Sequence, residues 1–258
     1  MATVSETREV AGFDGIELKG AGVLHVSQGE STSLRIEAEP DTLSRIATEV
    51  EGNRLVIRFR WLDVFLAFKA MGPIDFYVTT PHLRAVKIAG SGRLVGDTPI
   101  NGDRLYLSMS GSGKVALNLD VEELRVVVSG SGDLDLKGTA GRQELSVSGT
   151  CDYRAAYLET KGTDITIAGS GRAQVHATEH LDVSISGSGR VEYAGNAQVT
   201  QRISGSGSVL RLVDGSPAAA AAAWDAQPTA EAAEAVPDAP AEQTGADTRP
   251  ELPAAQDE

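Results

Sequence analysis

The chain has few of the features that usually stabilise small secreted folds or anchor proteins in membranes. It contains a single cysteine, Cys151, so no intrachain disulfide can form, and burial and backbone hydrogen bonds must hold the fold. No apolar run reaches the roughly 18 residues of a transmembrane helix. The first residues, 1–6, also lack the basic start and apolar stretch of a secretory signal. Two alternatives stay open: a cytoplasmic protein, or an envelope protein whose leader was removed.

Clusters of basic residues are missing as well. The 23 Lys and Arg are outnumbered by 36 Asp and Glu, which gives a formal net charge of -13. A negative protein without a local basic run repels the phosphate backbone. We therefore expect no nucleic-acid partner.

The composition changes sharply near residue 215. Residues 216–258 hold 16 Ala, 6 Pro and nine acidic residues against one base, Arg249. Such a segment buries too little apolar surface to offset its ordering entropy. We expect a folded domain over residues 1–214, with residues 1–82 less regular than 83–214, and a disordered acidic tail over 215–258.

A Gly-Ser-Gly triplet recurs through most of the expected domain. Successive copies are 21, 19, 19, 20, 18 and 18 residues apart, and the fourth is changed to Gly149-Thr150-Cys151. Gly20-Ala21-Gly22 resembles a degenerate first copy. The seven copies begin at Gly90, Gly111, Gly130, Gly149, Gly169, Gly187 and Gly205. This period is too short for helical-hairpin repeats and suits a coil of two or three strands.

Apolar residues alternate with polar ones on both sides of each triplet. Positions two and four before it, and four after it, are almost all aliphatic, which indicates two strands with one inward face each. The repeat predicts an all-β fold, a right-handed parallel β-helix (solenoid) of about 19-residue coils with Gly-Ser-Gly corners. Three residues after the first Gly, a solvent-facing column reads Arg93, Lys114, Asp133, Asp152, Arg172 and Arg190. We call this column the polar ladder.

The corners need glycine because a sharp bend between strands favours positive φ and close backbone approach. At Cys151 we expect a wider corner or extended backbone, and an unreactive thiol. Before residue 90 the pattern predicts strands near 16–18, 23–27, 34–37, 55–60 and 74–79, with Asp41 capping a helical turn. This part should close the N-terminal end of the core, since an open solenoid end exposes unpaired strand edges.

Several segments together resemble a known bacterial family. They are the opener Gly12-Phe13-Asp14-Gly15-Ile16-Glu17, the segment Asn53-Arg54-Leu55-Val56-Ile57, the step Pro81-His82-Leu83 and the serial corners. Over about residues 8–213 the chain resembles the head GIN domain family, named after an autotransporter adhesin head and formerly described only as a domain of unknown function. The resemblance implies a β-helical protein of the bacterial cell envelope, periplasm or surface, and no catalytic residue follows from it.

Three candidate sites are weaker than the ladder itself. Asp133 and Asp152 on adjacent coils could act as a glycosidase-like carboxylate pair, but a charge ladder offset by flanking bases is the simpler explanation. His176 and His180 have a metal-like spacing only in a helix, and we expect a strand leading into a loop. The Gly-rich corners lack the strand-turn-helix context of a phosphate loop. We expect no enzyme, no metal and no cofactor.

One apolar segment stands outside the repeat. Residues 61–71 concentrate several large apolar side chains, and a helix there would group some of them on one side. We expect a cap on the solenoid end or, as the alternative, a contact for a second copy or a membrane surface. The candidate residues are Trp61, Leu62, Phe65 and Phe68.

The sequence thus favours a binding protein of the envelope or surface, whose ligand is unknown and could be a glycan or another cell-surface component. A structural module that self-assembles is the main alternative, and a carbohydrate-active enzyme is a remote one.

Overall fold

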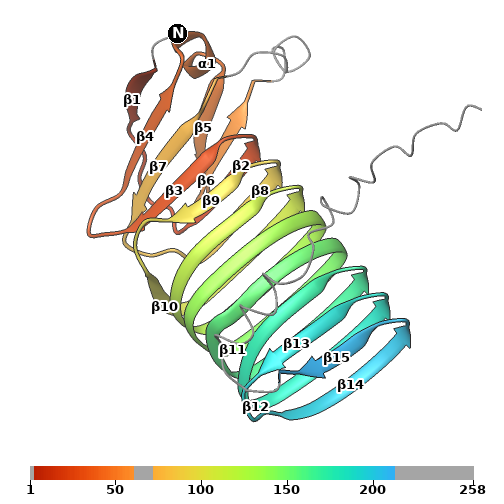
Figure 1. The fold of residues 1–258 in the computed structure, drawn as a ribbon. Coiled ribbons are helices and arrows are strands. Elements are labelled where there is room, and N and C mark those ends of the chain that lie inside the picture. Colours follow the sequence, from red (N-terminus) through yellow and green to blue (C-terminus); the bar gives the residue numbers. More distant parts are fainter. Residues whose placement is uncertain (1–2, 61–71, 213–258) are drawn as a thin grey trace, which may run out of the picture. The chain divides into compact units, whose positions relative to one another are not determined.

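The computed structural model of the chain describes residues 3–60 and 72–212. Within these ranges fifteen strands join a single sheet that winds into stacked coils (Figure 1). The predicted fold class is confirmed, because the strands form a β-solenoid of about seven turns with a spacing of about 19 residues. The regular coils comprise β8 (Ala85–Gly90), β9 (Arg93–Gly96), β10 (Ile100–Gly111), β11 (Lys114–Gly169), β12 (Arg172–Gly187), β13 (Arg190–Ala194), β14 (Gln198–Gly205) and β15 (Ser208–Arg211).

The coils are parallel and in register at the corners. Gly111 pairs with Gly90 on one side and Gly130 on the other, and Gly187 pairs with Gly169 and Gly205. Strand β11 alone is 56 residues long, because its ladder continues around successive corners. Stacked corners are joined by backbone hydrogen bonds such as Ser112 N–H to Gly90 O, 3.0 Å. The repeat in the sequence is therefore the repeat of the coil.

The first glycine of each corner has a conformation that other residues rarely adopt. Gly130 has a φ of +123°, and a Cβ added there would collide with the backbone oxygen of Gly111 in the preceding coil. That neighbour is backbone in the next layer, so it cannot move aside without disturbing the stack. The corner requires glycine for both reasons.

The third corner position is less demanding. Every residue with positive φ in the described ranges is a glycine, so Cys151 is not in that conformation, as expected. Its side chain is buried at 1% exposure. Where Gly132 stands in the preceding coil, an added Cβ would meet the flexible side chain of Met109 rather than backbone. The third position thus tolerates a side chain only in some coils, since at Gly113 an added Cβ would collide with the backbone oxygen of Gly92.

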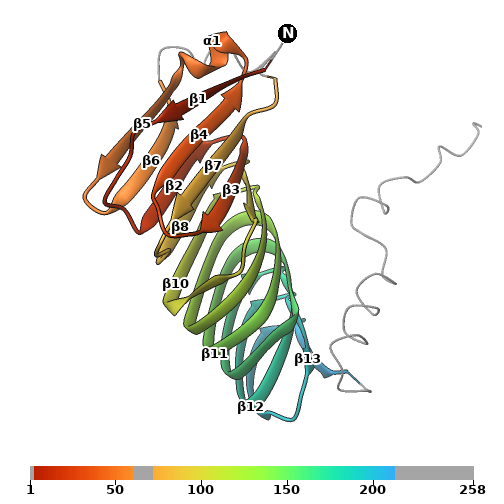
Figure 2. The ribbon, with the colours of Figure 1, turned by 90° about the vertical axis from the view of Figure 1, so that its left-hand side faces the viewer.

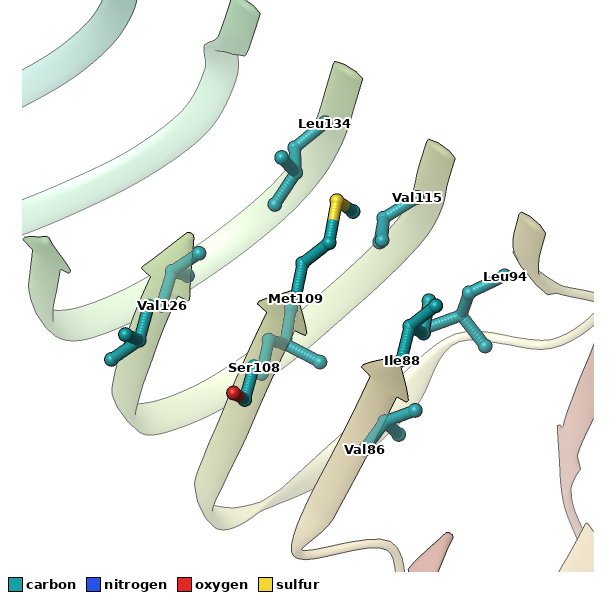
Figure 3. A pocket seen from close by; sticks show the side chains of 10 residues that line it. Val86, Ile88, Leu94, Ser108, Met109, Val115, Val126 and Leu134 are labelled. Atoms are coloured by element: carbon teal, nitrogen blue, oxygen red, sulfur yellow. The ribbon is translucent and has the colours of Figure 1, made fainter. Parts of the chain in front are cut away.

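The inner faces of the coils form a continuous aliphatic core, as predicted. Ile88, Val128 and Ile167, each two residues before a corner, are at most 2% exposed. The side chains around Met109 leave a cavity of only about 10 Å³, and Figure 3 shows Ile88, Leu94, Val115, Val126 and Leu134 among them. A gap of this size is at the lower limit for one water molecule and so is a packing defect, not a ligand site.

Two neighbouring coils carry polar groups inside the core. Gln143 is 0% exposed, and neither atom of its amide has a hydrogen-bond partner among the described residues. Tyr153 is also fully buried, and burial raises the pKa of its phenol far above the usual range. One coil after Gln143, the hydroxyls of Thr160 and Thr163 bond to each other at 2.6 Å.

The N-terminal block, residues 3–60 and 72–82, continues the solenoid and then departs from it. Strand β2 pairs in parallel with β8 and brings Gly20 opposite Gly90, so Gly20-Ala21-Gly22 is the first corner, as expected. Antiparallel pairs appear only in this block within the described chain. Its elements are β1 (Val4–Arg8), β2 (Gly15–Gly20), β3 (Val23–Gln28), β4 (Ser33–Ala38), α1 (Pro40–Leu43), β5 (Ile46–Glu51), β6 (Arg54–Phe59) and β7 (Asp75–Thr80).

Two details of the block differ from the sequence-based expectation. The N-cap of α1 is Glu39, whose side chain does not cap the helix, and Asp41 lies in the first turn, so the capping role of Asp41 was wrong. Pro40 sets the start instead, because its fixed φ suits the first helical turn. Strands β1 and β5 were not expected, since their mostly exposed side chains give no inward alternation.

A single arginine ties the two outer strands of the block together. Arg8, at the end of β1, donates through Nη1 to the carbonyl of Ile46 at 2.9 Å and to Thr48 Oγ1 at 3.1 Å. Its Nη2 donates to the carbonyl of Leu43 at 3.2 Å. Figure 2 shows β1, α1 and β5 together beyond the first coils. In the described chain these contacts close the N-terminal end.

Candidate binding surface

The structure brings the polar ladder together as one row along the coils. Lys114 pairs with Arg93, and Arg172 pairs with Asp152 and Arg190. None of the six side chains is buried. The row also enters the N-terminal block, because Val23 pairs with Arg93 on one side and with Asp75 on the other.

Charges in the ladder alternate in blocks of two: two bases, two acids, two bases. Lys114 Nζ lies 3.1 Å from Asp133 Oδ2, so one base offsets one acid across adjacent coils. Both side chains are more than a third exposed, and such a pair contributes little to stability. The ladder therefore presents its charges to the surroundings.

The second acid of the ladder is the perturbed one. Burial raises the pKa of Asp152 above its ordinary value, and the charge of Asp133 adds to this, while Arg172 and Arg154 act in the opposite direction. Next to it, burial raises the pKa of the Cys151 thiol to about 12, with the carboxylates of Asp152 and Asp133 contributing. A thiol in this state is a poor nucleophile, which agrees with the structural role expected for Cys151.

Other sequence candidates do not form a site in the described chain. His176 and His180 both lie within strand β12, so the expected loop there was wrong, and no group of three or more potential metal ligands is found in the residues described. Trp61, Leu62, Phe65 and Phe68 fall outside the described residues. No helix in the described ranges is long and apolar enough to cross a membrane.

A cluster that was not predicted lies on the N-terminal block. Tyr77 of β7 stands between Arg35 of β4 and His25 of β3, each its direct cross-strand partner. The rings of His25 and Tyr77 stack with centroids 4.7 Å apart and an interplanar angle of 14°. The Arg35 guanidinium lies 3.9 Å from the centroid of the Tyr77 ring. We call these three side chains the cap stack.

Carboxylates surround the cap stack. Asp97 Oδ1 lies 3.2 Å from His25 Nδ1, and Asp75 Oδ1 lies 3.5 Å from His25 Nε2. Glu37 forms an ion pair with Arg35 and accepts a hydrogen bond from the Tyr77 hydroxyl at 3.5 Å. Glu37 and Asp75 are themselves cross-strand partners, an unfavourable pairing of like charges that the Arg35–Glu37 ion pair offsets.

An open pocket of about 360 Å³ lies over this surface. Besides the cap stack and Asp97, four hydroxyl side chains line it. Ser33, Thr79 and Ser27 form one row on adjacent strands, and Thr7 stands beside Arg35. The pocket thus presents donors and acceptors from five strands or loops over a sheet whose other face is packed core.

The sequence predicted which face these side chains occupy, but not that they are neighbours. Arg35, Tyr77 and His25 each lie between two buried apolar residues, so alternation placed all three on the outer face. Nothing in the alternation showed that β7 lies between β3 and β4. That order depends on an antiparallel neighbour and on strands far apart in the chain.

The comparison with protein families agrees with this architecture. A family model described as "Putative auto-transporter adhesin, head GIN domain" matches residues 12–197, well over half of the 258 residues. The chain belongs to the head GIN domain family. No curated protein matches this head GIN domain.

Solved structures show the same fold. A putative adhesin from Bacteroides fragilis has 22% identity and a TM-score of 0.74, and covers 81% of this chain and 97% of its own. A putative adhesin from Parabacteroides distasonis has 23% identity, a TM-score of 0.65 and the same coverage. A putative lipid binding protein, also from P. distasonis, has 22% identity and a TM-score of 0.62, and covers 81% of this chain and 96% of its own. At these identities the likeness concerns the fold of the head GIN domain alone.

Residues of the segments that suggested the family contact one another or are buried in the structure. Asp14 accepts a hydrogen bond from Asn53 Nδ2 at 2.5 Å and lies 3.7 Å from Arg84 Nη1, which links the opener to β6 and to the step before β8. Ile16 and Leu83 are buried. The resemblance of this head GIN domain therefore depends on residues that build the first coil, and the cap stack is separate from them.

Proposed function

We propose that this chain is a non-enzymatic binding protein of the cell envelope or surface, adhesin-like, with the polar ladder as its contact surface. The observation that carries the proposal is the register of the ladder. Six charged side chains stand in one row at the spacing of the coils, so a partner that extends along the solenoid can meet them in series. The names of the family and of two structural neighbours, all adhesins, support the same class.

Multivalency gives such a surface its affinity. Each exposed charge contributes little alone, but linked contacts act at a high effective concentration. Binding through the ladder should also weaken with salt, because exposed charges are screened over about 10 Å at moderate ionic strength. Glycans and other cell-surface components are the partner classes we favour. The lipid-binding name of one neighbour adds lipids as a class to include in the assay.

The test measures binding of the labelled full chain to bacterial and epithelial cells, to a glycan array and to lipid vesicles. Arg93→Ala with Lys114→Ala removes two exposed bases of the ladder. Arg104→Ala with Arg125→Ala, two exposed bases before the corner on β10 and β11, is the matched control. We expect saturable binding that the ladder variant weakens several-fold and makes less sensitive to salt. Absence of any saturable binding, or equal loss in both variants, would overturn the proposal.

Self-assembly is the second candidate, and the C-terminal end of the described solenoid favours it. Ile203 of β14 is 40% exposed, whereas Ile185 at the same position one coil earlier is 1% exposed. Leu210 of β15 is 46% exposed. A second copy could cover this end, and the segment 61–71 with Trp61 offers another contact between copies. Sedimentation across a concentration series decides: a monomer throughout contradicts self-assembly, and dissociation by Ile203→Ser with Leu210→Ser would locate the contact at this end.

A further inference from the structure

We infer that the pocket over the cap stack is a binding site for a neutral, hydroxyl-rich sugar. This inference deepens the proposed function and rests on it, since it names the ligand class of one end of the same surface. It uses His25, Tyr77, Arg35, Asp97 and the hydroxyl row, none of which belongs to the polar ladder.

The charges of the pocket favour a neutral ligand. Its fixed cation, Arg35, is already paired with Glu37, and both ring nitrogens of His25 face carboxylates. An acidic sugar or a phosphate would meet the carboxylate of Asp97, which lines the pocket, without an uncompensated cation to bind. A cation would need an open aromatic face, but Arg35 and His25 stand on opposite sides of Tyr77.

The polar groups match the hydrogen-bonding pattern of a sugar. Each sugar hydroxyl both donates and accepts, so it needs donors and acceptors close together. The hydroxyls of Ser27, Ser33 and Thr79 do both, Asp97 accepts, and Arg35 donates. Hydrogen bonds to the two charged groups are the stronger ones. A volume of about 360 Å³ falls within the range of small-molecule sites.

The site is rigid before any ligand binds. Arg35, Tyr77 and His25 restrict one another by stacking, and their three strands are hydrogen-bonded neighbours over a packed core. Little side-chain entropy is therefore lost on binding, which favours affinity for a small ligand. The row of Arg93, Val23 and Asp75, which continues the ladder, lies two residues along the strands from His25 and Tyr77. A sugar unit in the pocket could belong to a longer glycan that continues along the ladder.

The experiment uses the full chain on an array of neutral and acidic oligosaccharides, followed by titration calorimetry with the best neutral oligosaccharide. Asp97→Asn and Thr79→Val change single pocket groups with little change in shape, and Tyr77→Ala removes the centre of the stack. Tyr106→Ala, on the strand face before the corner, is the matched control. Circular dichroism and thermal melting report folding, and the two conservative variants keep the test valid where Tyr77→Ala does not fold.

Binding of neutral oligosaccharides that falls about tenfold in Asp97→Asn, and by a similar factor in Thr79→Val, supports the inference when Tyr106→Ala binds normally. Glycan binding that is unchanged in the pocket variants but weakened in the ladder variant overturns the sugar pocket and leaves the proposed function standing. Binding of acidic glycans only, lost with the pocket variants, overturns the neutral class. The absence of saturable binding to cells, glycans and vesicles alike overturns both the inference and the proposed function.

Discussion

The regular coils and the N-terminal block share one sheet but are specified in different ways. In the coils each residue packs against its equivalent one repeat away, as Gly111 does between Gly90 and Gly130. In the block, β7 lies between β3 and β4, which run in opposite directions. A repeat places side chains of the same kind along a row. A block without repeats can bring unlike side chains together, and there the pocket of the cap stack is found.

The coils and the block should also differ in how far the effect of a substitution extends. A corner glycine in the coils contacts the backbone of the next layer, so a defect there affects its neighbours. The closing contacts of the block depend on particular side chains, of which Arg8 is the clearest. We therefore expect changes in the coils to act on the whole stack and changes in the block to act locally.

The largest effect should come from Gly130→Val. The added Cβ would collide with the Gly111 backbone, and valine cannot easily adopt a φ of +123°. We expect the free energy of unfolding to fall by about 3 kcal/mol or more, measured by urea denaturation. Gly102→Val is the matched control, because Gly102 has no neighbour within 4 Å of an added Cβ and should change stability by about 0.5 kcal/mol or less. Equal midpoints for the two variants would contradict the role of the corner.

A smaller and more local effect is expected from Arg8→Ala. Its guanidinium makes three hydrogen bonds to α1 and β5, and hydrogen bonds to charged groups contribute about 1.5–3 kcal/mol. Hydrogen exchange should become faster in β5 while β12 keeps its protection. Arg58→Ala, which removes an exposed ion pair with Glu49, should leave both strands unchanged. Faster exchange throughout the coils would show that the block and the coils do not differ in this way.

The smallest effect should come from Asp152→Asn, and its size depends on pH. Because burial and Asp133 raise the pKa of Asp152 in the folded state, ionising it costs more there than in the unfolded chain. Near neutral pH the asparagine variant should therefore be more stable, by less than about 1 kcal/mol. The gain should shrink as the pH falls through the raised pKa, where the wild-type carboxyl is protonated and uncharged.

Thermal unfolding over a series of pH values measures the effect of Asp152→Asn, with Asp135→Asn as the control. Asp135 faces Lys137 at 3.8 Å, so its replacement removes an attraction and should not stabilise the fold. A stability difference for Asp152→Asn that is constant with pH would show that the carboxylate pair does not interact as described.

The candidate sites could be predicted from the sequence only within the repeat. All six residues of the polar ladder stand in one row, because residues at the same distance from their corners are opposite each other in adjacent coils. Cys151 was placed correctly for the same reason. Strands β1 and β5 and the role of Asp41 were not, since exposed edge strands have no alternation and a cap depends on the local backbone. The order of strands around Tyr77 needed partners distant in the chain, which no local pattern encodes.

By itself the sequence determined the coil, its corners, its aliphatic core and the row of charges, because a short repeat can bury its apolar face only by stacking on its copies. The tertiary structure alone decided how the N-terminal block closes and which side chains meet there. His25, Tyr77 and Arg35 each looked like an ordinary outward residue of its own strand. They became one stack only when an antiparallel strand and two parallel ones were hydrogen-bonded side by side, at the spacing that brings cross-strand neighbours into contact.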